Sequence, residues 1–154
     1  MKRTLIFLCL TAALFSACKK ETTTAVENDY ISFKVNGVLK TGNNCQGVYF
    51  KSKLIDFSRI DILSNNNNEQ IFLDVTNPVV GKPVELMSAG SYYVKVGTDT
   101  IRYTSLAVDK ITITSLTTDR VTGTFQFTGT NYFVQNLDTK TITEGSFGCK
   151  VIVQ

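Results

Sequence analysis

Four cysteines carry the clearest chemistry in this chain, and Cys18 is considered first because it follows a signal-like segment. It ends a segment with a basic head, an apolar run over residues 5–15 and two small residues, MKRTLIFLCLTAALFSAC. A segment of this composition is typical of an export signal. Its apolar run is shorter than the roughly 20 residues that a membrane-spanning helix needs. We therefore interpret residues 1–17 as a signal peptide and not as part of the folded domain.

The residues Phe15-Ser16-Ala17-Cys18 resemble the lipobox of bacterial lipoproteins. The resemblance implies that Cys18 is acylated on its sulfur and becomes the first residue of the mature protein. Two or three acyl chains hold a protein stably on a membrane, whereas one chain binds marginally. The alternative is an ordinary cleaved signal, which would leave Cys18 as a free thiol or remove it.

Cys45 and Cys149 are the thiols that remain, because Cys9 leaves with the signal and Cys18 takes lipid. An even pair of thiols in an oxidising compartment is usually bonded. We predict a disulfide between the loop 43–47 and the last strand, where Cys149 shares a face with apolar residues. Two buried, unpaired thiols are the alternative, since free cysteine packs as a small apolar residue.

Catalysis is restricted because the chain has no histidine, which excludes Ser-His-Asp and Cys-His nucleophiles and histidine-bound metals. Carboxylates could still cleave glycosides, but Asp56 and Asp61 fall on opposite faces of an unbroken strand. Glu85 and Glu144 fall in predicted loops. The run Asn65–Asn68 lacks the interleaved carboxylates of a calcium loop, and we interpret it as a solvated hairpin loop. We predict no catalytic residues, no metal and no cofactor.

Tyrosines are the candidates for binding, because each presents a flat apolar face with a polar tip. Tyr92 and Tyr93 are adjacent on a predicted strand, so one side chain must point away from the core. We interpret most tyrosines as sheet packing and keep Tyr92, Tyr93 and Tyr103 as a candidate binding face for a glycan or an envelope protein.

A modification motif lies in a predicted turn. Asp99-Thr100-Ile101 resembles the Asp-Ser/Thr-aliphatic motif of O-glycosylated exported proteins of Bacteroidota. The resemblance implies a glycan on Thr100.

In the segments that must position these residues, apolar and polar residues alternate with a period of two, which is typical of β-strands. Asn36-Gly37 is a strong hairpin signal. No segment has a convincing helical period. The pattern predicts an all-β domain over residues 29–154, an antiparallel β-sandwich or partly closed β-barrel, behind a flexible tether at residues 18–28. After the first hairpin, the predicted strands are Gly47–Phe50, Leu54–Leu63, Ile71–Thr76, Tyr92–Val96, Ile101–Val108, Lys110–Leu116, Arg120–Thr128, Tyr132–Gln135 and Gly145–Val153.

Three segments of the domain, DYISFKVNGVLKTG, RVTGTFQFTG and TITEGSFGCKVIV, resemble small β-rich lipoproteins of the Bacteroidota cell envelope. The resemblance implies a location at the outer membrane but no established activity. Loss of Lys2 and Arg3 with the signal lowers the formal net charge from +3 to +1, so no basic surface for nucleic acid is indicated. We expect a non-enzymatic recognition or assembly module, with a calycin-like carrier of an apolar ligand or a carboxylate-only glycan hydrolase as alternatives.

Overall fold

The computed structural model describes residues 28–66, 68–84, 89–105, 110–133 and 137–154. These residues form strands, turns and loops, and the prediction of an all-β domain is confirmed. The strands are β1 (Tyr30–Val35), β2 (Val38–Gly42), β3 (Cys45–Lys51), β4 (Ser58–Asn66), β5 (Glu69–Thr76), β6 (Pro83–Val84), β7 (Ala89–Val96), β8 (Asp99–Thr104), β9 (Lys110–Leu116), β10 (Arg120–Asn131) and β11 (Asp138–Val153).

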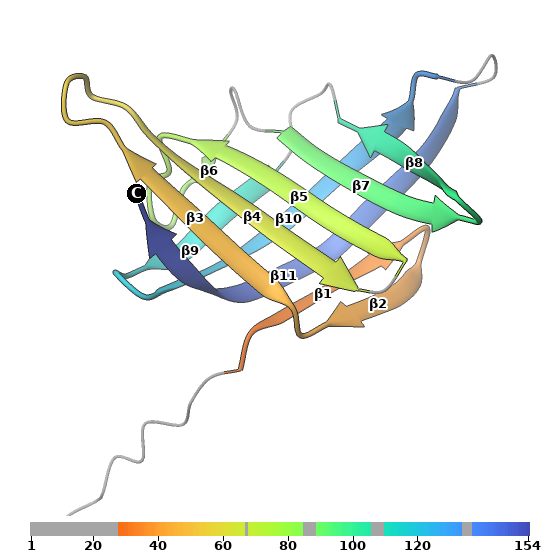
Figure 1. Ribbon diagram of the computed structural model, residues 1–154, viewed down its shortest axis with the longest axis horizontal. Coiled ribbons are helices and arrows are strands. Elements are labelled where there is room, and N and C mark those ends of the chain that lie inside the picture. The colour runs from red at the N-terminus through yellow and green to blue at the C-terminus, as the bar shows by residue number, and fades with distance from the viewer. Residues whose placement is uncertain (1–27, 67, 85–88, 106–109, 134–136) are drawn as a thin grey trace, which may run out of the picture.

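The strands lie in two layers that face each other (Figure 1). One layer, which we call the front layer, has the order β3-β4-β5-β7-β8. The other, the back layer, has the order β2-β1-β11-β10-β9-β6. Two strands of the back layer also pair with the front layer, so the molecule combines the features of a sandwich and of a partly closed barrel.

One of these links is a parallel pairing, in which Lys150–Val153 of β11 lies beside Gln46–Tyr49 of β3. The other is a single pair between Thr130 of β10 and Thr104 of β8. The parallel pair differs from the antiparallel pattern expected throughout. It arises because β11 is 16 residues long, which lets its last residues leave β1 and join the other layer.

The predicted disulfide closes this seam. Cys45 and Cys149 are bonded, with their Cα atoms 5.1 Å apart and a sequence separation of 104. The prediction is confirmed, although Cys45 is the first residue of β3 and does not lie in a loop. Both cysteines are buried, directly before the first parallel pair, Gln46 and Lys150. The bond therefore joins the two layers where β11 crosses between them.

Strand alternation fills the space between the layers with aromatic rings. Phe125 packs against Phe33 and Phe147 with ring centroids 6.0 and 6.2 Å apart. Phe33 of the back layer also meets Tyr92 of the front layer edge-on at 6.3 Å. Such contacts add to the apolar burial of the rings. The core is therefore built by contacts across the two layers.

Glycines make room for these rings, and Gly123 of β10 is one of the tightly packed cases. A Cβ atom at Gly123 would lie 2.5 Å from the Phe147 ring and 2.5 Å from the Thr112 carbonyl oxygen. Because one of these atoms belongs to the backbone, the strain cannot be relieved by a side chain alone. We predict that Gly123→Ala lowers the free energy of unfolding by about 1–3 kcal/mol. Urea unfolding of this variant and of Thr124→Ala, whose side chain faces outward, tests the prediction, and equal losses would contradict it.

Several boundaries differ from the sequence prediction. Leu54–Phe57 is a loop and β4 begins only at Ser58, and Tyr132 and Phe133 form a turn and not a strand. The two-residue strand β6 was not predicted. The Asn36-Gly37 turn is confirmed, with φ values of 48° and 83°.

Candidate binding groove

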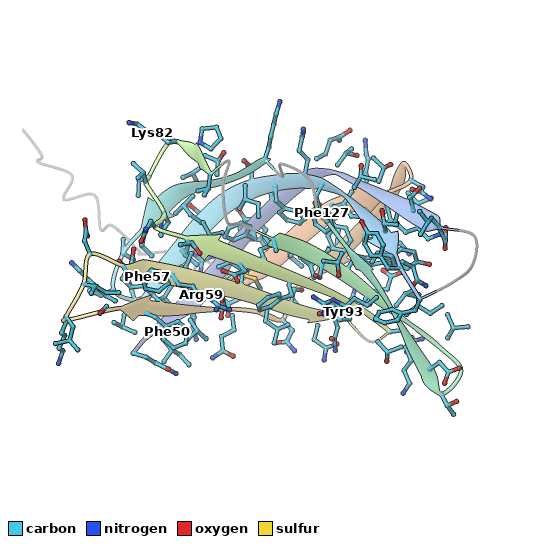
Figure 2. The ribbon with its side chains drawn as sticks, turned by 90° about the horizontal axis from the view of Figure 1, so that it is seen from above. Phe50, Phe57, Arg59, Lys82, Tyr93 and Phe127 are labelled. Atoms are coloured by element: carbon cyan, nitrogen blue, oxygen red, sulfur yellow. A yellow bond between two sulfur atoms is a disulfide. The ribbon has the colours of Figure 1, made fainter. Side chains whose placement is uncertain are left out.

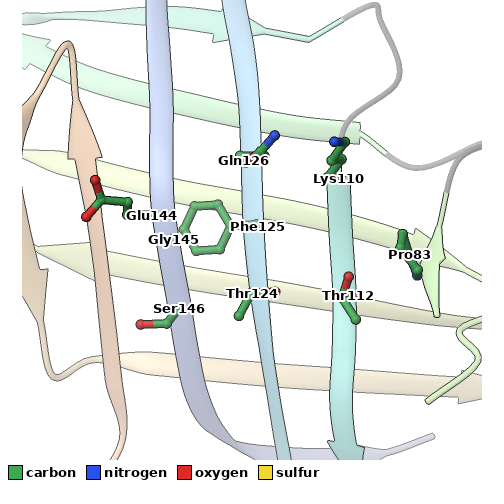
Figure 3. Close-up of a pocket in the computed structure, with 9 residues that line it drawn as sticks. All are labelled: Pro83, Lys110, Thr112, Thr124, Phe125, Gln126, Glu144, Gly145 and Ser146. Carbon is green, nitrogen blue, oxygen red and sulfur yellow. The ribbon is translucent and has the colours of Figure 1, made fainter. Parts of the chain in front are cut away.

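An open groove of about 410 Å³ lies on the outer face of the back layer (Figure 3). It runs across β9, β10 and β11 and has β6 at its margin. The residues that line it are Pro83, Lys110, Thr112, Thr124, Phe125, Gln126, Glu144, Gly145 and Ser146. Most of the side chains that reach into it are polar, so this groove is the best candidate for a binding site among the described residues.

A row of hydroxyl groups crosses the floor of the groove. Thr112 of β9 pairs with Thr124 of β10, and Thr124 pairs with Ser146 of β11. Ser146 in turn pairs with Ser32 of β1, beyond the groove. Alternation along each strand turns these side chains outward, because their neighbours Phe125 and Phe147 are buried.

The row gives the groove regular hydrogen-bonding capacity. Adjacent strands place successive hydroxyls about 4.7–4.9 Å apart, and each hydroxyl can donate one hydrogen bond and accept others. In the next row Thr114 and Thr122 join their hydroxyl oxygens at 2.8 Å, which shows that these side chains point the same way. A ligand with many hydroxyl groups would find complementary partners along this row.

Charged side chains mark the other end of the groove. Lys110 pairs across strands with Gln126, and Glu144 reaches the same end from β11. Glu144 Oε1 accepts a hydrogen bond of 2.7 Å from Lys34 Nζ. Glu144 was expected in a loop. It lies instead within β11, with φ of 51°, where the register with β10 shifts between Phe125 and Phe127.

Among the described residues of the lining, Glu144 is the one acid, whereas glycoside hydrolysis uses a pair of carboxylates. Over the described residues, no three side chains of the metal-binding types gather in one place. The hydroxyl row offers hydrogen bonds to a polar ligand.

Two of the other carboxylates considered in the sequence, Asp56 and Asp61, are not in the groove. Asp56 lies in the exposed loop before β4, so the unbroken strand that was expected to carry both Asp56 and Asp61 does not exist. Asp61 lies on the outer face of the front layer. Glu85 and Cys18 lie outside the described residues.

Sequence analysis missed a cluster of charges around Asp61. Asp74 of β5 pairs directly with Asp61 of β4. Arg59 binds the Asp61 carboxylate through Nε and Nη2 at 2.7 and 3.0 Å, and its Nε lies 3.2 Å from Asp74 Oδ1. That second contact is an ion pair without hydrogen-bond geometry, since Asp74 Oδ1 is buried without a hydrogen-bond partner. Asp61 and Asp74 lie on either side of the run Asn65–Asn68. A hairpin that turns within that run pairs them, and this was the sequence signal that could have identified the cluster.

Asp74 should make stability depend on pH. Burial of its carboxyl, opposed by Arg59 and reinforced by Asp61, raises its pKa. When the pKa of a carboxyl is raised in the folded state, the free energy of unfolding of the protein falls as the pH rises from the ordinary pKa through the raised one. We predict that Asp74→Asn gains stability relative to the wild type as the pH rises from below 3.8, the ordinary pKa of Asp. Urea unfolding over this range tests the prediction with Asp99→Asn as a control, and a falling or constant difference for Asp74→Asn would contradict it.

The predicted tyrosine face is wrong for two of its three residues. Tyr92 and Tyr103 are each only 3% exposed and belong to the core. Tyr103 donates a hydrogen bond of 2.6 Å to Asp138 Oδ2, and burial together with this carboxylate raises the pKa of Tyr103 to about 12. Burial also raises the pKa of Tyr92. These two rings are sheet packing, which was the interpretation given to most of the tyrosines.

Tyr93 does face outward, as strand alternation required of one member of the pair. Figure 2 shows it on the outer side of the front layer, on the same side as Phe50 and Arg59. The Arg102 guanidinium lies 5.5 Å from the centre of the Tyr93 ring, so part of that ring is already covered by a cation. Tyr93 alone does not form the predicted binding face.

Two further predictions concern the hairpins of the front layer. Thr100 is exposed on β8 opposite Lys95, beside a hollow of about 80 Å³, and its glycosylation stays a prediction. In the run Asn65–Asn68, the first two residues belong to β4 and are not a free loop, since Asn66 Nδ2 donates a hydrogen bond to the Thr41 carbonyl oxygen.

Across the part of the chain that the structure describes, no helix has the length and apolar character needed to cross a membrane. No protein-family model matches this sequence, and no curated protein is similar to it.

Proposed function

We propose that this protein is a non-enzymatic lipoprotein of the cell envelope that recognises a polyhydroxylated ligand, a glycan in particular. The observation that carries the proposal is the row Thr112, Thr124 and Ser146 in the groove of the back layer. Hydroxyls repeated at the strand spacing suit a ligand whose own hydroxyls recur along a chain. Lys110 and Glu144 add one charge of each sign to the lining of the groove, and Glu144 is paired with Lys34.

The proposed location follows from the sequence. The signal-like residues 1–17 and the lipobox-like end at Cys18 support a lipid anchor. The resemblance to Bacteroidota envelope lipoproteins supports the outer membrane. The segment 18–28 would then serve as the tether, long enough at about 17–20 Å to lift the domain off the lipid headgroups.

The packing of the interior supports recognition on the outside of the molecule over carriage of an apolar ligand within it. Phe127 illustrates this, because its ring would lie 2.5 Å from a Cβ atom at Gly90 of the opposite layer. Gly123 is equally crowded by Phe147. Interior positions that cannot accept one methyl group leave little room for a ligand.

An array of envelope polysaccharides tests the proposal. The protein, purified from its native membrane in detergent, should be retained by one class among peptidoglycan, lipopolysaccharide and capsular polysaccharide. It should release no new reducing ends, because Glu144 is the one acid among the described residues that line the groove. Retention by none of these classes would contradict recognition of a glycan, and steady release of reducing ends would contradict the non-enzymatic role.

A further inference from the structure

Two neighbouring loops expose aliphatic side chains at one end of the molecule. The loop between β3 and β4 presents Leu54 and Ile55, which are 93% and 67% exposed. The loop between β5 and β6 presents Val79 and Val80, each 52% exposed. We call this surface, residues 51–57 and 77–82, the apolar end.

The first loop holds a defined conformation. Ser52 Oγ accepts hydrogen bonds from the backbone nitrogens of Leu54 and Ile55 at 3.2 and 3.3 Å. The backbone nitrogen of Ser52 donates to the Phe57 carbonyl oxygen at 3.0 Å. The outward position of Leu54 is therefore built into the loop.

The second loop is fixed in a similar way. The backbone nitrogen of Gly81 donates to the Ile113 carbonyl oxygen at 2.8 Å, which ties the loop to β9. The backbone nitrogen of Lys82 donates to the Val79 carbonyl oxygen at 3.1 Å. Val79 and Val80 are thus held at the surface by a closed turn.

Reciprocal hydrogen bonds join the two loops at their bases. The backbone nitrogen of Ser58 donates to Asn77 Oδ1, and the backbone nitrogen of Asn77 donates to the Ser58 carbonyl oxygen, both at 2.7 Å. Figure 2 shows Phe57 of the first loop and Lys82 of the second toward the same end of the molecule. The apolar side chains of the two loops therefore belong to one surface.

The charges of this surface are mainly positive. Lys51, Lys53 and Lys82 lie in the same two segments as the aliphatic side chains, against one acid, Asp56, and all four residues are exposed. Aliphatic side chains together with lysines match the bilayer interface, where the acyl boundary takes the apolar groups and anionic headgroups attract the lysines.

Among the described residues, the turn after β10 at the opposite end of the molecule does not have this combination. Phe133 is 90% exposed there, in the turn after β10. The charges nearest to it in the sequence are Asp138 and Lys140, which bond to each other at 3.1 Å. Exposed apolar groups occur at both ends, but the excess of lysines occurs at the apolar end.

We propose that the apolar end docks on the anionic lipid surface of the membrane that holds the protein. The inference deepens the proposed function, because the lipid anchor would bring the loops to the bilayer. Leu54 and Ile55 would enter the acyl boundary while Lys51, Lys53 and Lys82 contact headgroups. The contact would give the tethered domain a fixed orientation.

Tryptophan fluorescence tests the docking, since the chain contains no tryptophan. The full acylated chain carrying Leu54→Trp is reconstituted into vesicles of phosphatidylcholine and phosphatidylglycerol in equal amounts. Insertion should shift the emission to shorter wavelength, and brominated lipid should quench it. Phe133→Trp is the matched control, because Phe133 is nearly as exposed at the other end. Its emission should stay that of an indole in water.

The outcomes separate this inference from the anchor. If the protein floats with vesicles but the indole at position 54 is no better quenched than the one at position 133, docking is overturned and the anchor stands. If the chain carrying Leu54→Trp together with Cys18→Ala still binds and is quenched, docking is supported without the anchor. An unquenched indole whose emission changes with protein concentration would assign the apolar end to a second copy, which overturns a lipid partner.

Discussion

Replacing Cys45 and Cys149 together by alanine should lower the free energy of unfolding by up to about 4–5 kcal/mol. The bond closes a loop of 104 positions, and the chain-entropy model gives a stabilisation of this size for a loop of that length. The loss should also be local, because the bond lies directly before the parallel pair of β3 and β11. That pair is one of the two links between the layers.

Urea unfolding of the wild type and the double variant measures the loss. Reductant should bring the wild type close to the double variant and leave the double variant unchanged. Amide hydrogen exchange should accelerate at Gln46–Tyr49 more than in the centre of β5, which has strand partners on both sides. A loss below about 1 kcal/mol, or alkylation of both thiols in unfolded and unreduced wild type, would contradict the prediction.

Substituting Cys18 by alanine should remove the protein from the membrane. If Cys18 carries the acyl chains, the wild type enters the detergent phase and incorporates a palmitate analogue. The variant should do neither, because each buried methylene contributes about 0.8 kcal/mol to membrane binding and all of them are lost together.

Cys9→Ala is the control for this experiment. Cys9 lies within the predicted signal, so its loss changes the cysteine count of the precursor but not the acylation site. This variant should be labelled and should partition like the wild type. A soluble, unlabelled wild type would contradict the lipid anchor.

The strands themselves could be predicted from the sequence because their signal is local. Lys110–Leu116 was predicted with the bounds that β9 has, and the Asn36-Gly37 turn lies where its sequence placed it. The strand prediction was wrong where apolar residues lie in a loop. Leu54 and Ile55 are apolar but exposed in a loop, so the predicted strand began at Leu54 whereas β4 begins at Ser58.

The candidate groove could not be predicted, because it depends on the register between strands. Thr112, Thr124 and Ser146 belong to three consecutive strands, and they form one row only because the pairing places them opposite each other. A shift of one residue would turn a strand's side chains to the other face, and the boundaries of the predicted strands did not fix the register. The same limit applies to the tyrosines, since alternation required one of Tyr92 and Tyr93 to face the core but did not say which.

The affinity of two threonine variants for the retained polysaccharide tests the central claim most directly. Thr124→Val removes the middle hydroxyl of the row, while Thr128→Val removes an exposed hydroxyl of the same strand that does not line the groove. The lost hydrogen bond, worth about 1 kcal/mol, should lower the affinity of the Thr124→Val variant for the polysaccharide about fivefold to tenfold. The affinity of the Thr128→Val variant should stay near that of the wild type. Titration calorimetry that finds equal affinities for the two variants would contradict recognition through the groove.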